Sequence, residues 1–413
     1  MSGILHVEDD SQQDAVQVSG DGRIPANNGI PIIKVIGVGG GGGSTVQHMI
    51  DENVQGVDFI AVNTDLQALN NNSAPTRIQI GLNTTRGLGS GSNPAVGCQA
   101  AEESREDLKN SIGESDIVFI TAGMGGGTGT GASPVIAQLA RKDLKALTVA
   151  IVTTPFSFEG KKQMMKALEG IEKLRDEVDA LIIVPNDKLL KNLPKNISLI
   201  SAFQECNRVL MRAVEGISGV ILKDGFINLD FNDIRTFLQK SGPALIGMGA
   251  ASGEGAIIKA LDAAINCPLL EDVAGCKARG VIVNLNVSPS FPLQDLNTAG
   301  DSIQAYYGDD ADVKYGITYD NELKDDEVKI TVVMAGLTRS ENSEAPAQAK
   351  EAPQVQEQVA PASVESASTN SIFGSFKREE DEEPAPQVSV KNTTNAFEGG
   401  KITLPSFLSK RSK

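Results

Sequence analysis

Two glycine-rich segments constrain the fold of this chain more than any other feature of its 413 residues. The first, GVGGGGGS at 37–44, follows the apolar run 32–38 and precedes a helical pattern at about 45–52. The second, GMGGGTGTG at 123–131, follows the run 116–121 and precedes a helical pattern at about 132–142. Glycine lets a backbone approach an anion closely, and free N–H groups at a helix start attract phosphate. Two such loops on neighbouring strand–helix units therefore predict a shared polyphosphate.

The rest of the chain alternates between buried-strand and helical patterns. Further strand-like runs occur at 57–63, 147–153 and 179–184, and a helix is expected after Asn93-Pro94. This βαβα series predicts an α/β fold with a doubly wound parallel sheet. An apolar stripe along 200–222 predicts a long helix packed between two domains.

A smaller α+β domain is expected after the long helix. The patterns predict helices at 231–240, 253–265 and 293–306, and strands at 244–249, 280–287, 312–318 and 328–336. The expected divisions are an arm at 1–29, a nucleotide-binding domain at 30–199, a central helix at 200–224, an α+β domain at 225–338, a linker at 339–400 and a terminal peptide at 401–413. The arm and the linker are polar and show no hydrophobic periodicity, so both are expected to be disordered. The linker carries the acidic run Glu379–Glu383.

Composition excludes several classes of function. The net charge of −16 and the pI near 4.7 argue against nucleic-acid binding and against direct contact with an anionic membrane. No apolar run is long enough to span a bilayer and no secretory leader is evident, so a cytoplasmic protein is expected. Two His and four Cys without a CxxC pair argue against a zinc site and against His-based catalysis. The four cysteines are interpreted as reduced core residues.

The first glycine loop alone leaves an alternative open. Gly37, Gly39 and Gly42 satisfy GxGxxG, and Asp65 follows roughly 20 residues later, as in a dinucleotide-binding fold. A Rossmann-type NAD-dependent oxidoreductase is therefore an alternative, although it explains neither the second glycine loop nor the segment NLDFND at 228–233. A P-loop NTPase is not indicated, because GxxxxGK[ST] is absent.

The string GGGTGTG at 125–131 resembles the signature of the tubulin/FtsZ superfamily, and the resemblance to the FtsZ family extends through residues 30–337. It implies a tubulin-like fold and a GTPase that polymerises head to tail at the bacterial division site at midcell. It also implies GTP or GDP as the ligand and Mg²⁺ with the phosphates, for which no protein ligand can be named. The implied phosphate contacts are Gly40, Gly41, Gly42, Gly43, Ser44, Gly126, Gly127, Thr128, Gly129 and Thr130.

Other implied contacts come from outside the two loops. Gly89, Ser90 and Gly91 resemble the segment that senses the γ-phosphate, and Glu159 resembles the ribose contact. Phe203 and Asn207 match the residues that stack on and read the guanine. Ser44 stands where the family usually has Asn, and Gln163 where it usually has Arg. The loss of that charge keeps open a non-hydrolysing structural paralogue.

The segment 228–233 resembles the family's NxDxxD loop through Asn228, Asp230 and Asp233. Asp233 would otherwise be interpreted as a helix N-cap, whereas Asp230 is harder to explain in that way. A helix of twenty-odd residues, roughly 30 Å long, separates these carboxylates from the base-binding end. They are therefore expected to act on the GTP of a neighbouring subunit in a head-to-tail filament.

The last thirteen residues, KITLPSFLSKRSK, are apolar and basic. Leu404, Phe407 and Leu408 lie at helical spacing, and Pro405 suits a helix start. The segment resembles the FtsZ terminal peptide that docks on membrane-tethering division proteins. Contact with the membrane is therefore expected to be indirect.

Overall fold

The computed structural model describes residues 30–190, 193–194, 196–222, 225–273, 276–291, 312–320 and 323–339. The expected helix at 293–306, the arm at 1–29, the terminal peptide and all but the first residue of the linker lie outside these ranges. Within them, no helix combines the length and the apolarity needed to cross a bilayer.

The N-terminal half is built on six parallel strands. They are β1 (Ile33–Val38), β2 (Asp58–Asn63), β3 (Thr76–Gln79), β4 (Ile117–Gly123), β5 (Leu147–Thr154) and β6 (Ala180–Pro185). Their order in the sheet is β3-β2-β1-β4-β5-β6, so the chain winds first to one side of β1 and then to the other. This order confirms the predicted doubly wound sheet and places its switch point between β1 and β4.

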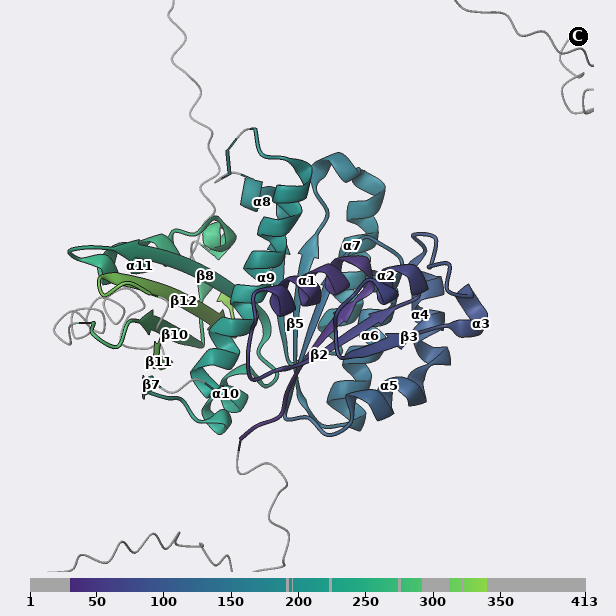
Figure 1. The fold of residues 1–413 in the computed structure, drawn as a ribbon, viewed down its shortest axis with the longest axis horizontal. Coiled ribbons are helices and arrows are strands. Elements are labelled where there is room, and N and C mark those ends of the chain that lie inside the picture. Colours follow the sequence, from purple (N-terminus) through teal and green to yellow (C-terminus); the bar gives the residue numbers. More distant parts are fainter. Residues whose placement is uncertain are drawn as a thin grey trace, which may run out of the picture. The chain divides into compact units, whose positions relative to one another are not determined.

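Helices cover both faces of these strands (Figure 1). They are α1 (Gly39–Asp51), α2 (Leu66–Asn70), α3 (Leu82–Thr85), α4 (Pro94–Glu103), α5 (Arg105–Ile112), α6 (Thr128–Gln138), the π-helix η1 (Leu139–Asp143), the 3-10 turn η2 (Ser157–Glu159), α7 (Lys161–Arg175) and α8 (Asn186–Leu190). Successive residues of β1 enter opposite cores, with Ile33 and Val35 in one and Ile36 and Val38 in the other. This burial on both faces explains why the strands read as continuous apolar runs.

The central helix α9 (Leu199–Leu222) contacts α1 on one side and β12 (Glu327–Ala335) on the other. The remaining elements are β7 (Gly225–Ile227), α10 (Phe231–Leu238), β8 (Gly242–Ser252), α11 (Ala256–Ile265), the 3-10 helix η3 (Pro268–Val273), β9 (Cys276–Lys277), β10 (Gly280–Val287), β11 (Asp312–Tyr319) and β13 (Thr338–Arg339). The predicted long helix between two packed layers is therefore present.

One connection was not predicted from the sequence. Strand β8 pairs in parallel with β6 through Ala180↔Gly242, Leu181↔Pro243 and Ile182↔Ala244. This short ladder joins the two halves into one sheet of eleven strands, in the order β3-β2-β1-β4-β5-β6-β8-β12-β10-β11-β7. Strand periodicity cannot reveal such a link, because only three residues of each strand take part.

Both helices that follow the glycine loops begin earlier than predicted. Helix α1 begins at Gly39 and not near Thr45, and α6 begins at Thr128 and not near 132. Glycine is a poor helix former, so local propensity predicts a later start. The starts are set instead by close packing, since a Cβ on Gly42 would lie 2.3 Å from the carbonyl oxygen of Thr121.

Helices α4 and α6 pack so closely that a methyl group between them should destabilise the fold. A Cβ on Gly131 would lie 2.0 Å from the carbonyl oxygen of Pro94. We expect Gly131→Ala to lower the free energy of unfolding by about 1–3 kcal/mol, measured by urea denaturation. Gly126→Ala is the control, because its Cβ would meet nothing within 4 Å. Equal stability of the two variants would contradict the close packing.

Candidate functional site

The parallel pairing of β1 with β4 brings the two glycine loops side by side. The ladder ends at Val38↔Ala122, and each loop follows directly. A Cβ on Gly39 would lie 2.8 Å from the backbone nitrogen of Gly129, and one on Gly41 would lie 3.0 Å from that of Gly123. Only glycine allows this approach. Gly40 and Gly126, in contrast, face open space, since a Cβ there would meet nothing within 4 Å.

The starts of α1 and α6 both lack a side-chain cap. The N-cap residues Val38 and Gly127 provide no side-chain hydrogen bond to the first turn. The first N–H groups of a helix need a partner, and the helix dipole favours an anion there. Two uncapped helix starts on adjacent strands therefore form a site suited to a chain of phosphates.

A third loop, at 89–92, contacts the second glycine loop. The hydroxyl of Ser90 lies 3.0 Å from that of Thr128, which lies 2.7 Å from the hydroxyl of the buried Thr64. A Cβ on Gly127 would lie 2.2 Å from the Ser90 hydroxyl. Within the second glycine loop, the Thr130 hydroxyl accepts a hydrogen bond from the Gly125 N–H at 2.8 Å. The third loop, which contains Gly89 and Gly91, thus lies beside the second glycine loop.

Helix α9 joins the first glycine loop through Asn207. The Asn207 amide donates to the Ser44 hydroxyl at 2.9 Å and accepts from the Thr45 hydroxyl at 3.0 Å. One turn earlier, Phe203 is 43% exposed and lies edge-on to the buried Phe156, with ring centroids 5.2 Å apart. This arrangement suits a planar base, because the exposed Phe203 ring can stack on its face and the fixed Asn207 amide can form hydrogen bonds with its edge.

These groups surround a cavity of about 220 Å³. It is lined by Gly41, Thr45, Gly123, Met124, Gly126, Thr153, Pro155, Glu159, Gln163, Asn186, Phe203, Cys206, Asn207 and Leu210. Among the residues that the structure describes, neither Lys nor Arg lines it. Any anion in this cavity would therefore be held by N–H groups and hydroxyls, with Glu159 as the one charged side chain of the lining.

Asn186 is a candidate ligand contact that sequence analysis missed. Its side chain is buried and lines the cavity, and its Oδ1 atom has no hydrogen-bond partner among the described residues. A buried polar atom without a partner is costly unless a ligand or water satisfies it. Asn186 directly follows β6, and ligands of such sheets bind at the carboxyl ends of the strands. That position was the signal available in the sequence.

Glu159 and Gln163 lie where the chain passes from η2 into α7. Glu159 is exposed, and its Oε1 atom accepts the Phe156 N–H at 2.9 Å, so part of the carboxylate closes the turn. Its other oxygen remains available to the cavity. Gln163 lies in the first turn of α7 and contributes no charge. Both residues line the cavity.

The acidic segment 228–233 lies outside the cavity, at the opposite end of α9. The expected roles of its two aspartates as caps are exchanged. Asp230 is the N-cap of α10, because its Oδ1 atom accepts the Asp233 N–H at 2.8 Å. Asp233 instead lies in the first turn, where its carboxylate is 3.6 Å from the ammonium group of Lys314. The interpretation of Asp233 as a cap was wrong because the helix begins one residue after Asp230. Asn228 and Asp230 are exposed.

Two other expectations are tested by single residues. Asp65, the acidic residue of the dinucleotide alternative, caps α2 by accepting the N–H groups of Gln67 and Ala68 at 2.9 and 3.1 Å. It is therefore engaged in the fold. The interpretation of all cysteines as core residues was wrong for Cys98, which is exposed on α4. Within the described ranges, no group of three His, Cys, Asp or Glu side chains could hold a metal ion.

Comparison with known proteins gives two family matches. Residues 32–194 match the model of the Tubulin/FtsZ family GTPase domain, and residues 242–338 match the C-terminal domain of the FtsZ family. The dinucleotide alternative is not favoured by these matches.

Individual relatives agree with the family models. A cell division protein FtsZ of Pseudomonas putida is 50% identical over 307 residues, covering 74% of this chain and 77% of that protein. One of Buchnera aphidicola subsp. Schizaphis graminum is 49% identical over 306 residues, covering 74% and 79%. A solved structure of an empty FtsZ dimer of M. jannaschii is similar with a TM-score of 0.71 and 37% identity, covering 77% of this chain and 95% of that one.

The position of Cys206 in the cavity wall leads to a prediction about the reactivity of its thiol. Burial raises the pKa of the Cys206 thiol to about 12, so the neutral and unreactive form persists far above neutral pH. We expect iodoacetamide at pH 9 to modify the exposed Cys98 and to spare Cys206, measured by mass spectrometry of the peptides. Unfolding in urea should make the two rates similar. Equal labelling of both thiols in the folded chain would show that Cys206 is not buried in the cavity wall.

Proposed function

This chain belongs to the FtsZ family of cell-division GTPases, and from this premise we propose how its own residues bind and cleave GTP. The observation that carries the proposal is the pair of uncapped helix starts, held side by side at the switch point of the sheet. In the proposal, the N–H groups of Gly40–Ser44 and Gly126–Thr130 hold the phosphates. The loop Gly89–Gly91 lies beside the terminal phosphate.

The nucleoside end of GTP is assigned to the groups around α9. Phe203 stacks on the base, and Asn207 reads its edge with the N–H and the lone pair that Ser44 and Thr45 leave unused. Asn186 supplies its unsatisfied Oδ1 atom, and Glu159 contacts the ribose. The described lining of the cavity has no Lys or Arg to balance the charge of a triphosphate, so a metal cation suits this role. We assign that role to Mg²⁺, which is usually held by phosphate oxygens and water.

Hydrolysis is assigned to a second copy of the chain. Helix α9 has 24 residues and is therefore about 36 Å long. Asp230 and Asp233 follow its far end, so they are remote from the cavity of their own subunit. Head-to-tail stacking would bring them to the neighbour's terminal phosphate, where a carboxylate can orient water and accept its proton. Such a contact is heterologous and extends into a filament.

The last part of the proposal concerns the partner of the terminal peptide and the location of the filament in the cell. We assign Leu404, Pro405, Phe407 and Leu408 to a membrane-tethering partner, and the filament to the cytoplasmic side of the division site at midcell. All four residues lie outside the described ranges. The proposed division into a disordered arm, two domains, a central helix, a linker and a terminal peptide serves this arrangement, with the linker as a tether.

Replacing one carboxylate should separate binding from hydrolysis. Asp233→Asn is expected to bind GTP normally and to lower GTP turnover about 100-fold, because a group that positions water is lost. Asp312→Asn is the matched control, since the Asp312 carboxylate lies 4.0 Å from the same Lys314 ammonium group. Phosphate release and nucleotide binding are measured on both. Comparable losses of turnover would assign the effect to Lys314 and not to a catalytic carboxylate.

The same scheme predicts that turnover per molecule rises with protein concentration and reaches a plateau on assembly. Phosphate release and light scattering are measured together across the assembly range. A constant rate per molecule at concentrations where no scattering appears would contradict hydrolysis by a neighbour.

Restoring a charge at position 163 should strengthen nucleotide binding. Gln163→Arg places a guanidinium in the cavity wall, and a charged hydrogen bond to a phosphate oxygen is expected to tighten GTP binding about tenfold, roughly 1.4 kcal/mol. Gln163→Met, of similar length and without charge, is the control. Nucleotide dissociation constants are measured with a fluorescent GTP analogue. Weaker binding by the Arg variant would place Gln163 away from the phosphates.

A further inference from the structure

The third loop closes in a tight turn, Ser90–Asn93, whose backbone conformation is costly for its own sequence. The Asn93 N–H donates to the carbonyl oxygen of Ser90 at 3.1 Å. Both central residues have positive φ, 59° at Gly91 and 58° at Ser92, as in a type I′ turn. Glycine adopts such angles freely, whereas serine adopts them at a cost. Contacts with other elements are therefore needed to hold the turn.

Contacts from two elements hold this turn. The second glycine loop packs against it, since a Cβ on Gly127 would lie 2.7 Å from the backbone nitrogen of Asn93. Helix α7 reaches it through Lys166, whose ammonium group donates to the carbonyl oxygen of Ser92 at 2.5 Å. A side chain from a separate element thus fixes the residue of the turn whose backbone is strained.

Lys166 lies on the face of α7 that packs against the second glycine loop. Gln163 and Gly170 lie three residues before and four residues after it, at positions that share one face of a helix. A Cβ on Gly125 would lie 3.0 Å from the carbonyl oxygen of Gln163, and one on Gly170 would lie 2.2 Å from Cγ2 of Thr130. The helix is therefore packed against the loop before and after Lys166, which gives the lysine a rigid base.

The charge of Lys166 is not neutralised by the carbonyl group that it contacts. Among the described residues, no carboxylate lies within 4 Å of its ammonium group. The Ser92 carbonyl oxygen takes one of its three N–H donors. The half-buried cation thus attracts an anion bound nearby, and it does so more strongly when the anion carries more charge.

The nucleotide cavity has little other positive charge to offer a phosphate chain. Its described lining contains no Lys or Arg, and Gln163, the residue of α7 that does line it, is uncharged. Lys166 follows one turn later on the same helix and brings its charge to the third loop instead. The one element therefore places a neutral side chain in the cavity wall and a cation behind the loop beside it.

We propose that Lys166 is a positioning residue for the terminal phosphate, and that its hold on Ser92 makes the site prefer GTP to GDP. This role rests on the proposed function, in which the third loop lies beside the terminal phosphate. In GTP, that phosphate places negative charge at the loop that Lys166 holds. In GDP the terminal phosphate is absent, so the position of the loop matters little for binding.

A purely structural role for Lys166 predicts a different outcome. A lysine that only stabilised the fold would, when lost, weaken the binding of both nucleotides alike. A lysine that positions the loop for the terminal phosphate changes the ratio of the GTP and GDP dissociation constants. That ratio therefore separates the two roles.

Lys166→Met removes the charge and the hydrogen bond while it keeps a long side chain. Dissociation constants of GTP and GDP are measured on the full chain below the assembly range, by competition with a fluorescent GDP analogue. We expect GTP binding to weaken about tenfold and GDP binding to weaken less than about twofold. The retained GDP binding also shows that the variant is folded. Lys173→Met is the matched control on the same helix, because Lys173 is exposed in its last turn, and it should leave both constants unchanged.

Lys166→Arg tests whether a charged donor at this position is what matters. Arginine can also donate to the Ser92 carbonyl oxygen, so the preference for GTP should stay within about threefold of that of the unchanged chain. Equal weakening of GTP and GDP binding by Lys166→Met would overturn the proposal, and so would no change in either. An Arg variant with the same ratio as the Met variant would overturn it as well.

Hydrogen exchange in the presence of GDP checks the physical cause. The Asn93 N–H closes the turn on Ser90, so its exchange should be at least about fivefold faster in Lys166→Met than in Lys173→Met. An unchanged exchange rate would show that Lys166 does not hold the turn.

The binding data also separate the role of Lys166 from the proposed function. If the unchanged chain bound no guanine nucleotide, both would be wrong. If it bound GTP and GDP, and Lys166→Met left their ratio as it was, only the role assigned to Lys166 would be wrong.

Discussion

The parallel pairing of β1 with β4 is the constraint on which the rest of the site depends. Its register, Val38 opposite Ala122, brings two strand–helix turns to one edge of the sheet. The backbones then approach so closely that a Cβ at Gly39 or Gly41 would collide with the other loop. Glycine is therefore required first by packing. The exposed N–H groups that suit a polyphosphate follow from that packing, since the same turns leave two helix starts uncapped.

Helix α9 connects this site to the rest of the molecule and also keeps it incomplete. Its first turns supply Phe203 and Asn207 to the cavity, while its last turns lead to Asp230 and Asp233. A rigid helix of about 36 Å cannot bend to bring the two ends together. Nucleotide binding and the proposed catalytic carboxylates are thus separated by the fold itself. Under the proposed function, assembly and hydrolysis become one event, because the contact that builds the filament also completes the site.

Much of the fold and many of the site's residues could be predicted, because strong local patterns specify them. The buried strands are continuous apolar runs, and the loops between them carry glycine. Features set by long-range packing were missed: the three-residue β6–β8 ladder, the early start of α1, and the burial of Asn186 in the cavity wall. The start of α10 at Phe231 agrees with the helix expected from residue 231, so the residue before that start, Asp230, is the cap, and the interpretation of Asp233 as the cap did not fit that boundary.

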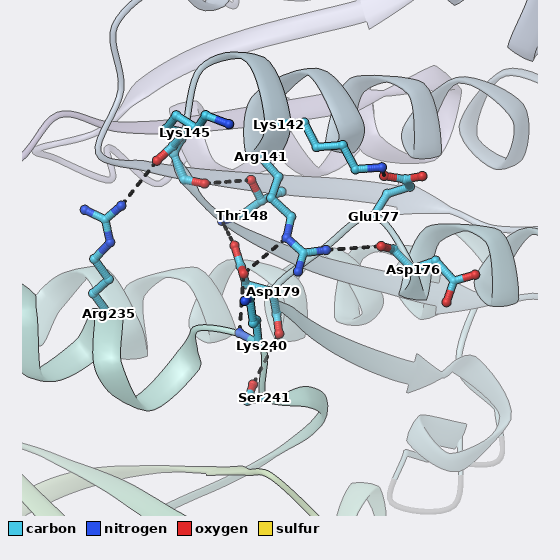
Figure 2. A network of polar contacts seen from close by, with 11 residues as sticks. Arg141, Lys142, Lys145, Thr148, Asp176, Glu177, Asp179, Arg235, Lys240 and Ser241 are labelled. Atoms are coloured by element: carbon cyan, nitrogen blue, oxygen red, sulfur yellow. Dashed lines mark hydrogen bonds and ion pairs between the residues drawn. The ribbon is translucent and has the colours of Figure 1, made fainter.

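The distribution of charge follows from the way each cavity is built. Under the proposed function, backbone N–H groups at two uncapped helix starts hold the phosphates and do not depend on side-chain identity, so departures from the family pattern at Ser44 and Gln163 are compatible with the same class of ligand. Lysine and arginine are then free to gather elsewhere. They do so at the cavity of about 380 Å³ lined by Arg141, Lys142, Lys145, Arg235 and Lys240 (Figure 2), where two helix ends carry partial negative charge and favour cations. Those helix ends cannot neutralise five cationic side chains, and among the described residues the buried Asp179 and Glu177 leave three of the five without an ion pair.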